Sequence, residues 1–114
     1  FNDANKQKCM LIYDGYNRDN RLVSEFNYYN FGQQKWNKFP TLNLLRSKAI
    51  LNYLPNTNTF LISGGYKYDY GQGLYLKNME YLHFGSNNKN KKWNTCPINM
   101  KSNRSEHCSC VLNG

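Results

Sequence analysis

The residues of this sequence that are best suited to binding chemistry are two Arg-Ser pairs, Arg46-Ser47 and Arg104-Ser105. An arginine presents a planar fork of donors that can bind a carboxylate or a phosphate through two parallel hydrogen bonds. A serine hydroxyl beside it adds a donor and an acceptor that can orient the bound group. The two pairs lie 58 residues apart, which indicates that one structural unit occurs twice.

Catalytic chemistry is less well represented. The two histidines, His83 and His107, lie in segments that we expect to be strands, and the sequence shows no Ser-His-Asp arrangement. The seven acidic residues include no pair spaced like a catalytic acid and base. The cysteines form neither a CxxC motif nor a Cys-His pair with zinc spacing. We therefore predict that the chain itself is not an enzyme and that it holds no cofactor and no metal.

The four cysteines are Cys9, Cys96, Cys108 and Cys110, an even number that would suggest disulfides in a small secreted protein. Cys108 and Cys110 alternate within a predicted strand, so their side chains share one face and cannot readily bond to each other. We therefore predict buried free thiols. Free thiols indicate a reducing compartment, and hence a cytoplasmic location.

The composition is basic and rich in aromatic residues. The formal net charge is +8 with a pI near 9.4, and 16% of the residues are aromatic. This balance favours an acidic partner. The lysines are scattered through Asn-rich text such as NKNKKWN, without the motif of an RNA-binding domain, so we expect solvated loops rather than a nucleic-acid surface. No apolar window approaches the roughly 18 residues that span a bilayer, and no membrane partner is predicted.

An internal repeat organises the chain. Each copy contains an Asp-Gly or Gly-Gly pair, then a Tyr, then a Trp, and then an Arg-Ser pair. Matching residues of the two copies are 50 to 58 positions apart. Such a period with these residues resembles the kelch-repeat β-propellers. The matched positions are Asp14-Gly15 with Gly64-Gly65, Tyr29 with Tyr81, Trp36 with Trp93, and Arg46 with Arg104.

The resemblance implies an all-β fold built from kelch-type blades of four antiparallel strands. Residues 1–38 would be strands b, c and d of one blade, residues 39–97 a complete blade, and residues 98–114 the innermost strand of the next, all in one partial propeller domain. Apolar runs and turn signals place the strands, with the Tyr-rich segment 66–73 as a loop. The expected strands are residues 9–13, 22–31, 35–39, 48–54, 59–63, 76–84, 91–96 and 105–114.

The residues that carry the resemblance have a structural role in such a fold. Large flat side chains fill the gap between neighbouring twisted blades and keep one polar atom for a hydrogen bond. The paired glycines end a strand where a β-carbon would obstruct the backbone. The expected structural residues are Gly15, Tyr29, Trp36, Gly64, Gly65, Tyr81 and Trp93.

The resemblance also implies a binding surface at the mouth of the central channel. In kelch substrate adaptors, residues just before the innermost strand and just after the double glycine grip peptide side chains. The partner would then be a protein or peptide with acidic or phosphorylated segments. Arg at these positions is also common for bonding one blade to the next, so both roles remain open. The matching residues are Tyr16, Arg46, Ser47, Tyr66, Arg104 and Ser105.

Two further alternatives remain open. The chain holds about two blades, and an isolated pair would leave sheet faces and edges uncovered. The remaining blades would come from the same longer chain or from further copies in a homo-oligomer. The blades are a protein-binding scaffold or adaptor, or else the non-catalytic kelch portion of a larger phosphatase- or oxidase-type enzyme.

Overall fold

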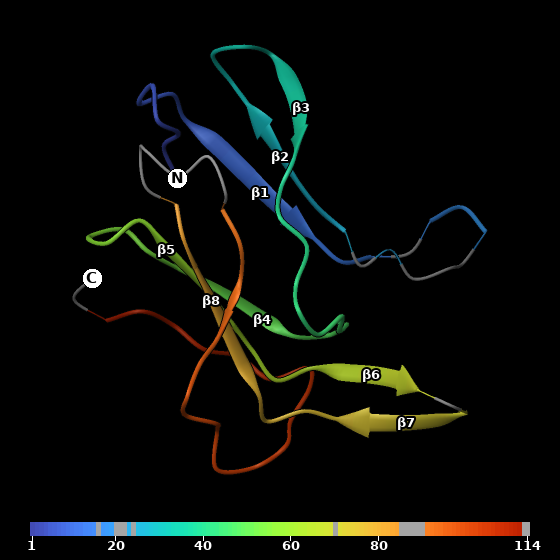
Figure 1. Cartoon of the computed structure of the whole chain (residues 1–114). Helices are drawn as coiled ribbons and strands as arrows, with labels where there is room; N and C mark the ends of the chain where they lie inside the picture. The colour runs from blue at the N-terminus through green and yellow to red at the C-terminus, as the bar shows by residue number, and fades with distance from the viewer. Residues whose placement is uncertain (16, 20–22, 24, 70, 85–90, 113–114) are drawn as a thin grey trace.

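The computed structural model describes residues 1–15, 17–19, 23, 25–69, 71–84 and 91–112 (Figure 1). The described residues form nine β-strands in three antiparallel sheets and no helix. The expected all-β class is therefore confirmed.

The first sheet contains three strands in the order β1-β2-β3. They are β1 (Cys9–Tyr13), β2 (Phe26–Asn30) and β3 (Lys35–Lys38). β1 ends immediately before Asp14-Gly15, and a turn that contains Gly32 joins β2 to β3, in keeping with the preference of Gly and Asp for turns. Of the expected strand 22–31, residues 22 and 24 lie outside the described residues, and the described residues 23, 25 and 31 are not in β2.

The second sheet contains four strands in the order β4-β5-β8-β9. They are β4 (Ile50–Leu54), β5 (Thr59–Ser63), β8 (Met79–His83) and β9 (Asn94–Thr95). The turn between β4 and β5 starts at Pro55 and ends at Asn58 with φ 49°. Asn tolerates this left-handed conformation better than most residues, and so the turn chemistry fixes the hairpin.

A third sheet replaces the expected loop at residues 66–73. There β6 (Tyr66–Asp69) and β7 (Gln72–Tyr75) form a hairpin that projects from the rest of the molecule (Figure 1). Gly71, at φ 79°, takes a turn conformation that glycine adopts without steric cost. The loop prediction was wrong because it relied on Gly and Asp, which favour turns, and overlooked the alternation of the tyrosines, which is typical of a strand.

The expected innermost strand at residues 105–114 is also not observed over its described part, residues 105–112. A strand is stable only where a neighbouring strand pairs with its backbone. Within the described chain no strand is paired with this segment. Its sequence pattern alone does not supply that partner.

The core lies between the first two sheets and is largely aromatic. Phe26 and Phe39 from one side meet residues of the second sheet and its flanks, with ring centroids 5.1 Å apart for Phe26 and Trp93 and 5.4 Å for the stacked Phe39 and Phe84. Phe1 adds its ring to the same cluster, 5.0 Å from Phe84. Burial of such side chains provides the main driving force for packing the sheets. The buried cluster comprises Phe26, Phe39, Leu42, Phe60, Ile62, Leu82, Phe84 and Trp93.

The cross-strand residue pairs of the two larger sheets match one another. In the first, Leu11 is opposite Tyr28 and Tyr28 is opposite Asn37. In the second, Leu61 is opposite Tyr81 and Tyr81 is opposite Asn94. Tyr28, and not the Tyr29 matched from the sequence, is therefore the counterpart of Tyr81. Adjacent tyrosines made the sequence match ambiguous by one residue, which inverts the face that the side chain occupies.

Candidate functional site

Four segments meet at the double glycine. We call this region the glycine junction and define it as residues 46–48, 64–66, 76–78 and 100–107. Backbone hydrogen bonds hold the segments together: the Gly65 N–H donates to the Arg104 carbonyl at 2.8 Å, and the Leu76 N–H donates to the Gly65 carbonyl at 2.9 Å. Ser47 and Tyr66 bond to each other in both directions, each at 2.8 Å. The junction thus brings together five of the six residues expected at a binding mouth: Arg46, Ser47, Tyr66, Arg104 and Ser105.

Glycine is required at positions 64 and 65. Both residues have positive φ, 63° and 103°. A β-carbon on Gly64 would collide with the Arg104 carbonyl, and one on Gly65 would lie 2.7 Å from the Ser47 carbonyl. The equivalent Asp14-Gly15 also has positive φ, 69° and 141°, but Gly15 has open space around it. Among the described residues, other chain segments therefore approach the glycine closely at Gly64-Gly65 and not at Gly15.

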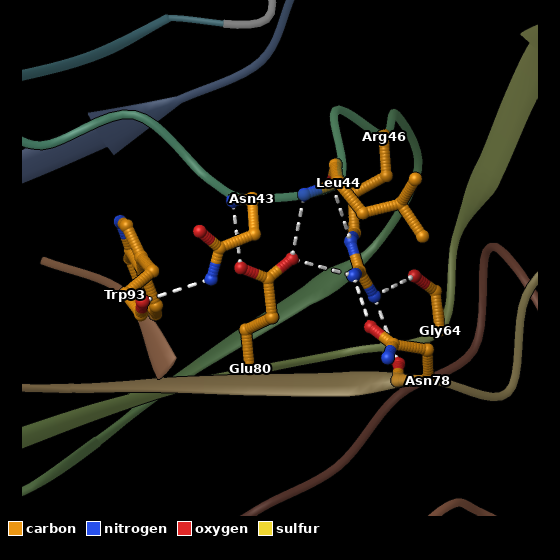
Figure 2. Close-up of polar contacts among 7 residues, drawn as sticks. All are labelled: Asn43, Leu44, Arg46, Gly64, Asn78, Glu80 and Trp93. Atoms are coloured by element: carbon orange, nitrogen blue, oxygen red, sulfur yellow. Dashed lines mark hydrogen bonds and ion pairs between the residues drawn. The ribbon is translucent and has the colours of Figure 1, made fainter. Parts of the chain in front are cut away.

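Arg46 is buried in this arrangement, which fits the structural one of its two expected roles rather than the binding of a peptide. Its side chain is fully buried, and all five of its N–H donors are used within the chain (Figure 2). Nε donates to the Leu44 carbonyl at 3.2 Å, and the two terminal nitrogens donate to Gly64, Asn78 and Glu80. The fork that could capture a carboxylate already holds one from the same chain.

Glu80 is the partner that the sequence analysis missed. This β8 carboxylate is fully buried, lies 2.8 Å from Arg46 Nη2, and accepts the backbone N–H groups of Asn43 and Leu44 at 2.8 and 3.1 Å (Figure 2). It thereby fixes the segment before β4 onto the sheet. Burial lowers the pKa of the Arg46 guanidinium below its ordinary value, although the Glu80 charge opposes that shift. An acid inside the apolar strand text MEYLH was the available signal, because buried acids need partners.

Ser47 and Tyr66 are also partly committed to the fold. Ser47 is buried, and its hydroxyl donates weakly to the Tyr66 carbonyl at 3.4 Å. The half-buried Tyr66 ring packs edge-to-face with the exposed Tyr75, with centroids 5.4 Å apart. Tyr66 therefore joins the junction to the projecting hairpin, while Ser47 is shielded from solvent.

Arg104 and Ser105 retain access to solvent. Arg104 is exposed, but its backbone is fixed at both polar groups: its N–H donates to Leu76 at 3.0 Å and its carbonyl accepts from Gly65. Ser105 is half-buried beside it. The expected Tyr16 lies outside the described residues. A binding role stays a prediction for Arg104 and Ser105.

The surroundings of Arg104 are cationic. Lys77 and Lys101 are exposed, and the Met100 N–H next to Lys101 donates to the Lys77 carbonyl at 2.9 Å. Lys48 forms an exposed ion pair with Glu106 at 3.0 Å. Such a surface pair contributes little to stability because water and salt screen it. The three exposed cations, Lys77, Lys101 and Arg104, therefore lie on segments that are hydrogen-bonded to one another; we call these three residues the cationic rim.

His107 lies at the inner side of the junction, and not in a strand as expected. Its Nε2 is 3.2 Å from the Ser63 hydroxyl, while its buried Nδ1 has no partner within the described structure. Burial, and secondarily the charge of Arg104, lowers the pKa of His107 below its usual 6.5. Without a group at Nδ1 to orient the ring, this pair lacks the third member of a catalytic triad. His83 is exposed and contacts the Thr59 hydroxyl at 3.0 Å.

The remaining motif residues divide between the two sheets. Trp93 is buried and donates from Nε1 to the Pro40 carbonyl at 2.8 Å, as expected for a packing residue. Trp36 is instead 54% exposed, and Tyr81 is 37% exposed. Of the two tryptophans only Trp93 is buried, and nothing in the described chain covers the outer side of β3, where Trp36 lies.

The cysteines are free, but only one of them is buried. Cys9 is buried and Cys96 is half-buried, and burial raises the pKa of both thiols above the ordinary value. Cys108 and Cys110 are exposed because their segment joins no sheet, so the prediction of buried thiols was wrong for them. Across the described residues no group of three or more His, Cys, Asp or Glu side chains is placed to hold a metal ion.

Comparison with known proteins adds no relative to this picture: no family model and no curated protein matches the chain. In the described part of the chain no helix is long and apolar enough to cross a membrane.

Proposed function

We propose that this chain is a protein-interaction module of the kelch-propeller type, which binds acidic or phosphorylated peptide segments at the cationic rim. The observation that carries the proposal is the exposed Arg104 on a backbone fixed by Gly65 and Leu76. A group that is already positioned loses less entropy when it binds a ligand.

The cationic rim suits an anionic ligand in charge and in geometry. The Arg104 guanidinium can bind a carboxylate or phosphate through two hydrogen bonds, and Lys77 and Lys101 add longer-range attraction. Ser105 and the Tyr66 ring lie on the same junction and can orient the peptide. The net charge of +8 favours the approach of an acidic partner.

The two repeat positions therefore have different roles in this proposal. Arg46 stabilises the junction from inside through Glu80, and Arg104 presents the same chemical group to solvent. The rigid first arginine supports the second because both contact the Gly64-Gly65 segment. The module acts as a scaffold or substrate adaptor.

The free thiols favour a reducing compartment for this function. All four cysteines are free thiols, and two of them, Cys108 and Cys110, are exposed. Disulfides form and persist in oxidising compartments. We therefore propose the cytoplasm as the place where the module meets its partner.

Binding to peptides of defined charge tests the proposal. The probes are a fluorescein-labelled Glu-rich peptide, its phosphoserine-containing version, and a Lys-rich peptide of equal length, each titrated by fluorescence anisotropy at about 50 and 200 mM salt. We expect the two acidic probes to bind, with affinity that falls as salt rises, and the Lys-rich probe not to bind.

Matched variants locate the site. Arg104→Ala should weaken binding at least tenfold, because it removes the guanidinium without touching the buried network. Lys35→Ala, an exposed lysine on β3, should have little effect. Equal losses in both variants would show that net charge alone binds the probe, and no loss in Arg104→Ala would overturn the assignment of the rim.

A further inference from the structure

The outward surface of the first sheet is apolar and exposed. We call it the open face and define it as Met10, Ile12, Tyr29, Phe31 and Trp36. Tyr29 lies directly opposite both Met10 and Trp36 in the ladders, and its ring contacts Phe31 and Trp36 at centroid distances of 5.1 and 5.3 Å. Four of the five are strongly exposed, Met10 at 43%, Ile12 at 44%, and Phe31 and Trp36 at 54% each.

The same five positions of the second sheet are completely covered. Aligned by the ladders, they fall in the buried core, where none is more than 5% exposed. The counterparts of the open face, in the same order, are Phe60, Ile62, Leu82, Phe84 and Trp93. A surface that repeats a buried one in residue size and register is therefore a surface built to be covered.

The interface between the first and second sheets shows what kind of surface covers a face of this type. The first sheet lays its inner side on the second, and that side carries Phe26, Tyr28 and Leu11 packed against the core. The ladder counterparts of these three on the free side of the second sheet are Met79, Tyr81 and Leu61. The chain thus contains one complete sheet-to-sheet interface and, on its two outer sides, the two halves of another. Residues 107–109 already lie over part of the second-sheet half, where His107 contacts Ser63 and Ser109 contacts Asn52.

In the described chain, part of the β1 edge that faces away from β2 has no neighbouring strand. Residues at odd positions of β1 direct their backbone groups away from β2, since the Lys8 carbonyl accepts from Phe31. Cys9 pairs there with Phe1, with its N–H donating at 2.8 Å and its carbonyl accepting at 3.1 Å. In the part of the chain that the structure describes, no strand lies beyond Leu11 and Tyr13, whereas their counterparts Leu61 and Ser63 pair with β4.

The chain also carries an unused copy of the missing strand. Residues 108–111 correspond to the β4 residues 50–53, at the spacing of the Arg-Ser pairs. They lie in no strand, and the Ser109 hydroxyl accepts a hydrogen bond from the Asn52 side chain on β4. The segment is therefore close to the second sheet and free to pair on its other side.

We propose that a second copy of this chain docks head to tail. The open face of one copy covers the free side of the other copy's second sheet, and residues 108–111 of that other copy add as a strand to the edge of β1. By analogy with β4, Cys110 would lie opposite Leu11 and Cys108 opposite Tyr13. Because the contact joins two different surfaces, it can repeat from copy to copy, and it gives a closed ring when the rotation between successive copies completes a circle. The inference does not rest on the peptide-binding proposal.

The exposed tryptophan provides a direct readout. Over a concentration series from about 0.1 to 100 µM, light scattering and sedimentation would report the mass, and acrylamide quenching would report the exposure of Trp36. We expect the mass to rise from one chain to a discrete assembly while the quenchable fraction of tryptophan emission falls, since Trp36 becomes buried as Trp93 already is.

Two pairs of variants separate the proposal from loss of folding. Trp36→Lys should hold the chain as a monomer, and Tyr75→Lys, at an equally exposed aromatic on the β6–β7 hairpin, should not. Cys110→Pro should weaken the assembly at least tenfold because it removes one donor of the added strand, while Cys110→Ala should assemble normally. The buried emission of Trp93 reports that each variant is folded.

The opposite outcomes are equally clear. A chain that stays monomeric with Trp36 quenchable at 100 µM would exclude a second copy as the occupant and would assign the open face to another sheet of the same or a different protein. An assembly that survives Trp36→Lys and Cys110→Pro unchanged would place the contact on some other surface, and would also overturn the proposal.

Discussion

Trp36 and Trp93 occupy the same place in the two larger sheets but have opposite surroundings. Trp93 lies among aromatic rings and bonds to the Pro40 carbonyl, and Trp36 faces solvent beside Tyr29. The difference lies in the neighbours: the first sheet covers Trp93, and nothing in the described chain covers Trp36. A repeated residue therefore has a repeated role only where its partner surface is also repeated.

Truncating each tryptophan should give the largest difference between the sheets. We expect Trp93→Ala to cost about 3 to 5 kcal/mol of unfolding free energy, since it leaves a cavity in the core. Trp36→Ala should cost less than about 1 kcal/mol, as for a surface substitution. Urea unfolding of the monomer at about 0.1 µM measures both. Equal losses would mean that Trp36 is already covered in solution.

The two arginines give the next difference. Arg46→Lys keeps the charge but cannot supply five donors in a plane, so we expect a loss of about 1 to 3 kcal/mol from unsatisfied buried acceptors. Arg104→Lys, at the exposed counterpart, should change stability by no more than about 0.5 kcal/mol. Thermal or urea unfolding at neutral pH compares them. A tolerant Arg46 would show that the buried network is replaceable by water.

The strands were predictable from the sequence where local signals determine them. Apolar runs bounded by turn residues located β1, β5 and β8, and Pro55 located the hairpin between β4 and β5. Residues 105–112 were misassigned although they copy the pattern of β4, because pairing requires a neighbouring edge that the pattern does not provide.

The candidate site was predictable only in part. The repeat identified Ser47, Tyr66 and Arg104, and the structure brings them to one junction. The burial of Arg46 was not predictable, since its partner Glu80 is 34 residues away and only the fold brings them together. Two residues of identical type and local sequence thus differ in exposure, which is a tertiary property.

The smallest expected effect concerns His107, which lies where the junction meets the second sheet. Burial lowers its pKa below 6.5 in the folded state, so the unfolded chain binds a proton more readily. The stabilisation is complete above pH 6.5 and is lost as the pH falls from there through the folded-state pKa. The unfolding free energy should therefore decline as the pH falls below about 6.5. The decline should be modest because the ring is only half-buried.

A comparison of variants isolates this contribution from the carboxylates that titrate nearby. His107→Gln should flatten the pH dependence of unfolding between pH 7.5 and 5.5, since the glutamine carries no ionisable group. His83→Gln removes the exposed histidine of β8 and should retain the slope of the original chain. If His107→Gln kept that slope as well, the His107 ring would be solvated in solution. The contact of residues 100–107 with Ser63 and Gly64 would then be open, and Arg104 would lose the fixed backbone on which its proposed role depends.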